Sequence, residues 1–193
     1  MANQDAAFGL RLSRSGNGSD LIGMQNKYRI AANYNTSIFQ GDLVTVATNG
    51  TIVRAAAGGT ALILGVFNGC QYNDPTTGKP VFSNFYPAST NVDIEAFVID
   101  APHAVYEIQA DAAMPIADLF GNFDIVDATA GSTASGISHT ELDVTTGATT
   151  AGLPLKAIDI STDPENSDPA TANTNVMVVI NNHLFSAGTT GLA

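Results

Sequence analysis

The chain has one cysteine and no tryptophan among its 193 residues. A single cysteine cannot form an internal disulfide, so Cys70 is expected to be a small buried apolar side chain. A chain of this length buries roughly 70% of its unfolded surface, so a core can form without disulfides or a metal. We expect one domain, or one domain with an extension.

Charge is scarce and mostly of one sign. Charged residues make up 13% of the chain, against a usual share of about 25%. The 18 acidic residues outnumber the 7 basic ones, which gives a formal net charge of −11 at pH 7. Because an acidic molecule is repelled by a phosphate backbone, nucleic acid is not expected as a partner. The hydrophobic share of 45% favours a folded protein over a disordered acidic tail.

Long hydrophobic runs are also lacking. The most apolar stretch, residues 61–67, is far shorter than the roughly 20 residues that span a bilayer. Residues 1–20 lack the run of about 7 to 15 apolar residues that an export signal requires. We therefore expect no membrane partner, and a protein of the cell interior or of a particle assembled there.

Basic residues are concentrated near the N-terminus. Residues 1–29 carry four basic and two acidic residues, a local charge of +2, whereas residues 30–193 carry −13. The early residues show no sustained period of 2 or 3.6. The sequence thus predicts an extended N-terminal arm at 1–29 and a β-rich body at 30–193.

The arm contains apolar side chains that should not remain in water, because each one left exposed forfeits about 1.5 to 3 kcal/mol of possible burial. They should be covered by the body, by a sister subunit or by a partner. The basic residues are either ordinary solvated charges or the means by which the arm docks on an acidic surface. The candidate docking residues are Phe8, Leu10, Arg11, Leu12, Arg14, Lys27 and Arg29.

The body is composed of short apolar runs separated by turn residues. The pair Asn49-Gly50 between two β-prone runs predicts a hairpin at 43–54, because both residues tolerate positive φ. Asn68-Gly69 is a second candidate turn. Residues 93–109 alternate around a turn at 100–103, which predicts a second hairpin.

Helix is expected to contribute little. Residues 111–120 have helical spacing, but Pro115 limits any helix there to about two turns. Further strands are predicted at 123–126, 142–144, 153–160 and 176–180. A long acidic loop without periodicity, residues 161–175, separates the last two. The fold class is therefore mainly β, a small β-barrel or sandwich of about nine to eleven short strands with at most one short helix.

Signatures of chemistry are weak throughout. The histidines His103, His139 and His183 are far apart in sequence and show no metal-ligand spacing, so no metal and no cofactor are expected. The acidic residues between 159 and 168 lack the order of a calcium loop. There is no nucleophile motif, which predicts a protein that is not an enzyme. A hydrolase with a nonlocal site is the third alternative.

An aromatic group at residues 72–86 leaves an alternative open. Tyr72, Phe82, Phe85 and Tyr86 could stack on sugars, as a carbohydrate or host-surface binding module displayed on a virion would require. They could equally form a small satellite core or a subunit contact.

Several stretches resemble a known class of protein. Residues 40–44, 49–56 and 64–67 look like the strand, hairpin and glycine-strand sequence of capsid decoration (cement) proteins of tailed bacteriophages. The region around 7–11 and the ending 156–183 are similar to small head proteins of marine tailed phages.

The resemblance implies a structural protein that is made in the host cytoplasm and binds the outer surface of an icosahedral capsid. It would stabilise the shell by cross-linking neighbouring subunits of the major capsid protein. The resemblance further implies assembly as a homotrimer.

Overall fold

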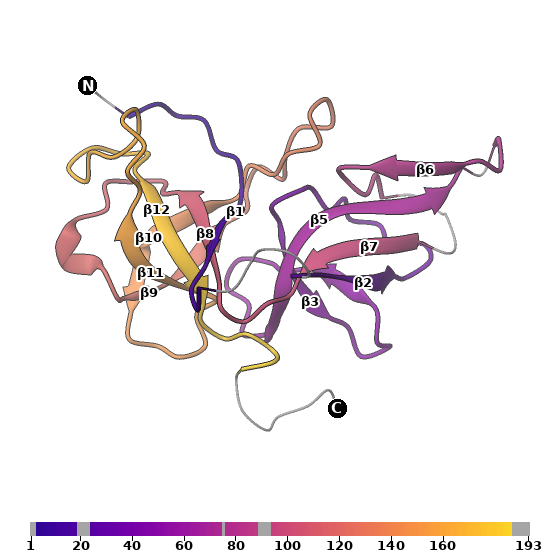
Figure 1. The fold of residues 1–193 in the computed structure, drawn as a ribbon, viewed down its shortest axis with the longest axis horizontal. Helices are drawn as coiled ribbons and strands as arrows, with labels where there is room; N and C mark the ends of the chain where they lie inside the picture. The colour runs from indigo at the N-terminus through magenta and orange to yellow at the C-terminus, as the bar shows by residue number, and fades with distance from the viewer. Residues whose placement is uncertain (1–2, 19–23, 75, 89–93, 187–193) are drawn as a thin grey trace.

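The computed structural model describes residues 3–18, 24–74, 76–88 and 94–186, and the fold is mainly β (Figure 1). Its described residues form twelve strands in two six-stranded sheets. The first sheet has the order β3 (Leu43–Val46), β4 (Ile52–Arg54), β2 (Gln25–Ile30), β7 (Ile94–Ile99), β5 (Ile63–Asn73) and β6 (Pro80–Ser83). The second has the order β1 (Arg11–Ser15), β8 (Ala104–Gln109), β12 (Asn175–Ile180), β11 (Leu155–Ile160), β9 (Asn122–Val126) and β10 (Glu141–Ala148).

Five strands of the first sheet close into a barrel, because β3 pairs with both β4 and β5. Among the described barrel strands, β2 and β4 pair through a parallel bridge between Ile30 and Ile52, and the other strand pairs are antiparallel. Alternate residues of β7 point inward, so Ile94, Ala96 and Val98 are buried in the barrel interior. The prediction of a mainly β fold with a small barrel is confirmed.

The predicted hairpin at 43–54 is confirmed, and Gly50 takes the left-handed φ of +77° in its turn. The predicted turn at Asn68-Gly69 is wrong. Strand β5 runs straight through these residues, with a register shift between Phe67 and Cys70 and Gly69 at φ +121°. The dipeptide forms a β-bulge in a long strand, because a residue with positive φ can offset a ladder without reversing the chain. The ends of β5 and β6 then project beyond the barrel (Figure 1).

The second sheet curls on itself. Its last strand, β10, meets the end of β8 through the bridge between Leu142 and Ala110, and Asp111 N–H donates to Leu142 O at 3.0 Å. The core inside this sheet is continuous with apolar residues of the barrel strands, such as Leu43 and Val66. This core, shared by the two sheets, is distinct from the cluster of buried residues inside the barrel.

The predicted second hairpin at 93–109 is wrong in its pairing, although both strands exist. Strand β7 pairs with β2 and β5 in the barrel, whereas β8 pairs with β1 and β12 in the other sheet. Residues 100–103 carry the chain from one sheet to the other. The helical candidate at 111–120 contains a single 3-10 turn, η1 (Ile116–Asp118), which begins after Pro115.

The described residues of the predicted arm lie within the body and do not stand apart from it. Residues 11–15 form β1 beside β8, and residues 25–30 form β2 inside the barrel. Leu10 and Met24 are buried in the shared core. The chain's own body thus covers these apolar side chains, and two extra strands bring the total above the expected nine to eleven. The apolar residues Leu21 and Ile22 lie outside the described residues.

The long loop at 161–175 fastens the start of the chain. Asn3 Nδ2 donates to the carbonyl oxygen of Asp168 at 2.9 Å, and Asn166 Nδ2 donates to Gln4 O at 2.8 Å. Gln109 of β8 completes the contact, because its Nε2 donates to the same Gln4 oxygen. This aperiodic loop is therefore held in place by specific side-chain hydrogen bonds.

Candidate functional site

An apolar groove of about 410 Å³ lies beside β1, where the N-terminal segment crosses the barrel. The chain approaches its own backbone closely here, since Leu10 N–H donates to Gly41 O at 2.9 Å. Gly9 has φ +68°, and a Cβ atom on it would lie 2.7 Å from the Cβ of Ser138. Glycine is required at this crossing, because another side chain would push the segment away. The groove is lined by Phe8, Leu10, Arg11, Leu12, Gln40, Gly41, Val66, Phe67, Asn68, Ile99 and Ile137.

Among the described residues that line this groove, Arg11 carries the only charge. Its guanidinium lies 4.7 Å from the centre of the Phe8 ring and also pairs with the carboxylate of Glu107 on β8. Ser161 Oγ donates to the other Glu107 oxygen at 2.6 Å. Burial raises the pKa of Glu107, but the hydrogen bonds from Ser161 and Arg11 outweigh it and keep this pKa below its ordinary value. The Arg11 side chain is nevertheless 61% exposed, so it can meet a partner.

The seven predicted docking residues divide between separate surfaces. Phe8, Leu10, Arg11 and Leu12 line the apolar groove. Arg14 is exposed on β1 and lines a neighbouring, more polar hollow together with Arg11. Lys27 and Arg29 lie on the outer face of β2 instead, where Lys27 Nζ pairs with Glu95 at 2.9 Å.

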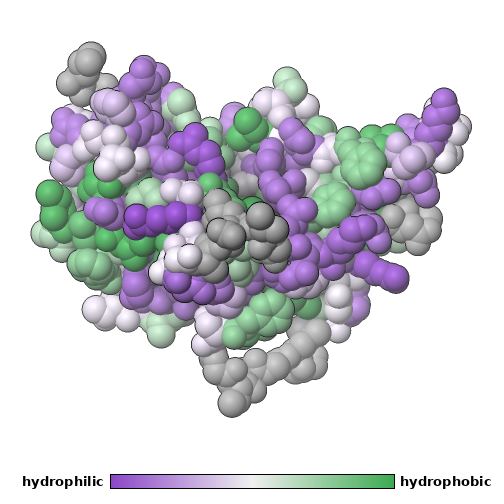
Figure 2. All heavy atoms as spheres, in the orientation of Figure 1, coloured by the Kyte–Doolittle hydropathy of each residue, from purple (hydrophilic) through white to green (hydrophobic). Residues whose placement is uncertain are grey.

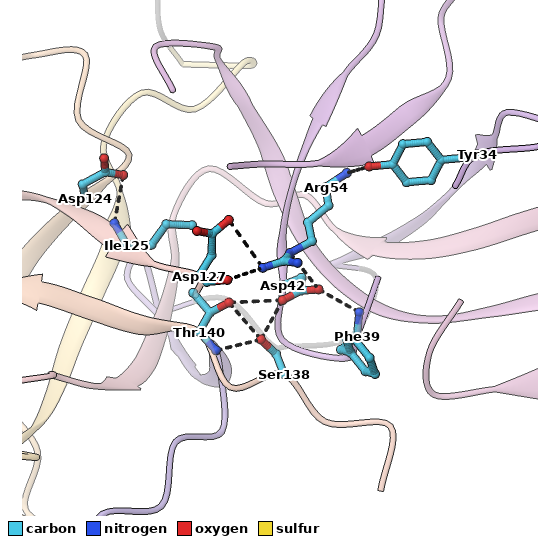
Figure 3. Close-up of polar contacts among 9 residues, drawn as sticks. All are labelled: Tyr34, Phe39, Asp42, Arg54, Asp124, Ile125, Asp127, Ser138 and Thr140. Carbon is cyan, nitrogen blue, oxygen red and sulfur yellow. Dashed lines mark hydrogen bonds and ion pairs between the residues drawn. The ribbon is translucent and has the colours of Figure 1, made fainter. Parts of the chain in front are cut away.

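A buried polar network lies between the barrel and the second sheet (Figure 3). Asp42 is fully buried, and it accepts hydrogen bonds from Ser138 Oγ at 2.6 Å and from Phe39 N–H at 2.8 Å. Arg54 of β4 reaches across, with Nε 3.5 Å from Asp42 Oδ2 and a terminal nitrogen 3.5 Å from Asp127 Oδ2. These residues give no signal in the sequence, because they are scattered over about 100 positions and form no local motif.

The groups of this network are buried and bonded to one another. Burial raises the pKa of Asp42 above its ordinary value, although the hydrogen bonds and the charge of Arg54 act in the opposite direction. Both Asp42 oxygens are occupied by donors within the chain. Ser138 Oγ donates to Asp42 Oδ1 at 2.6 Å and accepts the N–H of Thr140 at 3.0 Å, so this hydroxyl is engaged within the buried network. The arrangement is that of a structural clamp.

The possible metal ligands and the aromatic residues at 72–86 do not gather into a single site in the described structure. Across residues 3–18, 24–74, 76–88 and 94–186, no cluster of three or more His, Cys, Asp or Glu side chains is arranged to hold a metal ion. The aromatic group at 72–86 does not form one platform, because Tyr86 is fully buried and Phe85 stacks on Phe39 with ring centres 5.4 Å apart. Phe82 alone of these four is strongly exposed, at 71%.

Comparisons with known proteins identify no relative: no family profile, no curated protein and no solved structure matches the chain. Within the described part of the chain, no helix is long and apolar enough to cross a membrane.

Proposed function

We propose that this protein is a structural, non-enzymatic component of a tailed-phage head. It binds the outer surface of the icosahedral shell and stabilises it by bridging neighbouring capsid subunits. The observation that carries the proposal is the apolar groove beside β1, with Arg11 at its side, on a molecule that is otherwise strongly acidic.

The groove is suited to a protein partner. Phe8, Leu12 and Ile137 leave apolar surface partly exposed, and burying such surface is the main driving force of protein association. Arg11 and Arg14 add exposed positive charge beside it. The partner would offer an apolar side chain near a carboxylate, which fits a contact between this surface and an acidic patch on a shell subunit.

The net charge favours an outer position. A molecule of charge −11 is repelled by packaged DNA, whereas the outer surface of the shell carries no such penalty. The local cations on β1 would then orient the molecule with its groove toward the shell.

The docking surface is preformed. Strand β1 is already paired with β8, so binding does not require the N-terminal segment to become ordered at that moment. Docking therefore avoids an ordering cost of about 0.5 to 1.5 kcal/mol for each immobilised side chain. Binding to the assembled shell shifts the assembly equilibrium by mass action. If three copies associate, their grooves act together through effective concentration.

Co-sedimentation with purified shells that lack the protein tests the proposal. We expect Ile137→Ser and Arg14→Glu to reduce occupancy, and Arg14→Glu also to weaken the dependence of binding on salt. Phe120→Ser is the matched control, because Phe120 is 72% exposed on a different surface. Full occupancy with both the groove variant Ile137→Ser and the neighbouring Arg14→Glu would remove this surface from the mechanism. Failure of the unaltered protein to bind shells would overturn the function itself.

A further inference from the structure

A second groove, of about 490 Å³, lies at one end of the barrel and differs in character from the first. Its floor is apolar: Ile30 and Ile94 belong to the barrel interior, and Tyr72 packs against the same cluster. Apart from Ala31 and Ala32, its remaining lining is polar and comes from three neighbouring strands and the turn before β4. These polar residues are Arg29, Thr51, Gln71, Asn73 and Glu95.

The strand registers place several of these side chains in one row. Arg29 of β2 is directly opposite Glu95 of β7, and Glu95 is directly opposite Gln71 of β5. Gln71 is in turn opposite Phe82 of β6. Residues directly opposite on neighbouring strands lie on the same face of a sheet. The row across these four strands therefore contains a guanidinium, a carboxylate, an amide and an exposed phenyl ring. Figure 2 shows hydrophobic (green) and hydrophilic (purple) side chains intermixed over this part of the barrel.

The charges in this row leave one cation available. Glu95 is already paired with Lys27 at 2.9 Å. Among the residues that the structure describes, Arg29 takes part in no ion pair, and its side chain is exposed. The local charge of Lys27, Arg29 and Glu95 is +1 on an acidic molecule. A guanidinium whose N–H groups are not engaged in an ion pair can bind a carboxylate through two parallel hydrogen bonds.

We propose that this groove binds an acidic saccharide, a sugar that carries a carboxylate such as a uronic acid. The volume falls within the range of about 300 to 1,000 Å³ of small-molecule sites. The Arg29 fork receives the sugar carboxylate, and the amides of Gln71 and Asn73 exchange hydrogen bonds with hydroxyl groups. Phe82 supplies a flat apolar face for the next ring of a longer chain. This inference goes beyond the proposed function and uses a different surface.

A matched pair of probes tests the role of the carboxylate. Methyl β-D-glucuronide and methyl β-D-glucoside differ only in the group at C6, and each is titrated into the full chain labelled with ¹⁵N. We expect the glucuronide to shift the amide signals of residues around Arg29, Gln71 and Glu95. The glucoside should bind about tenfold more weakly, because it lacks the charge-assisted hydrogen bonds.

Two pairs of variants assign the contacts. Arg29→Gln should reduce glucuronide binding about tenfold, to the level of the glucoside, whereas Arg14→Gln should leave it unchanged. Phe82→Ala should weaken binding of a uronic-acid disaccharide, whereas Phe120→Ala, which removes an equally exposed ring, should not. Absence of shifts at the groove, equal binding of the two probes or indifference to Arg29→Gln would overturn the proposal. Shell co-sedimentation of Arg29→Gln is expected to stay normal, so failure of this inference is distinguishable from failure of the shell-binding function.

Discussion

Arg54 of the barrel and Asp42 form a buried ion pair, with Nε 3.5 Å from Oδ2, and Arg54 extends it to Asp127, which follows strand β9 of the second sheet. The Arg54 side chain is 10% exposed and that of Asp42 is fully buried. One guanidinium thus links two segments about 85 residues apart at the boundary between the sheets (Figure 3).

Replacing Arg54 should therefore destabilise the whole protein. Arg54→Met leaves the buried carboxylate of Asp42 without its cation, and we expect a loss of about 3 kcal/mol in the free energy of unfolding. Urea unfolding at pH 7 measures this loss. Lys27→Met is the control, because the Lys27–Glu95 pair is exposed on both sides and should contribute less than about 1 kcal/mol. Equal urea midpoints for Arg54→Met and the unaltered chain would contradict the clamp.

Acid should weaken the protein through His183, which is fully buried after β12. Burial lowers the pKa of His183 below its ordinary value of 6.5, with His103 acting in the same direction and Asp100 opposing both. The unfolded chain then binds the proton more readily than the folded chain does. Stability due to neutral His183 is present above pH 6.5 and is lost as the pH falls through the lowered pKa of the folded state.

Urea midpoints measured from pH 7 to pH 5 test this dependence. We expect the unaltered chain to lose stability over this interval and His183→Gln to lose less, whatever its stability at pH 7. His139→Gln serves as the control for titration of a histidine elsewhere in the chain. Parallel pH curves for His183→Gln and the unaltered protein would show that His183 does not titrate differently on folding.

The N-terminal segment should be needed for stability. Leu10 is 3% exposed in the shared core, so Leu10→Ala should cost about 2 to 4 kcal/mol of unfolding free energy. Ile116→Ala is the matched control, because Ile116 is 66% exposed and should change stability by less than about 0.5 kcal/mol. Deleting residues 2–15 removes β1 and uncovers the edge of β8, and hydrogen exchange of the β8 amides should then accelerate. Unchanged exchange there would mean that β1 is dispensable to the sheet.

Gly65 should tolerate no side chain. A Cβ atom at this position would lie 2.2 Å from the backbone oxygen of Ile99 on β7, and backbone in the centre of a barrel cannot move aside cheaply. Gly65→Ala should lose about 3 kcal/mol or more in thermal or urea unfolding. Gly152→Ala has open space around the added methyl group and should be close to neutral. A stable Gly65→Ala variant would show that the β5–β7 contact is looser than described.

Local patterns predicted individual strands well but paired them poorly. Ile94–Ile99 and Ala104–Gln109 are both strands, yet the turn at 100–103 carries the chain between sheets and does not close a hairpin. Asn68-Gly69 has the chemistry of a turn and forms a bulge, because β5 is held on both sides by β3 or β6 and by β7. Pairing with strands from distant parts of the chain decides whether such a dipeptide forms a turn or a bulge. A short stretch of sequence does not reveal that pairing.

The predicted docking residues are close together in the sequence, but the structure places them on two separate surfaces. Phe8, Leu10, Arg11 and Leu12 were predicted to act together, and they line one groove. Lys27 and Arg29 were grouped with them by sequence position, but the pairing of β2 with β7 places them on the barrel. The Asp42–Arg54–Asp127 network could not be predicted, since each member is an isolated charged residue until the fold brings them together.

The sequence by itself determined the mainly β class, the position of most strands and the acidic charge, because these depend on side-chain type and on short-range alternation. The tertiary structure alone decided which strands meet, that the N-terminal segment belongs to the core, and which charges share a groove. Those outcomes depend on contacts between residues far apart in the chain, where the free energy of burial and of ladder pairing outweighs local preference.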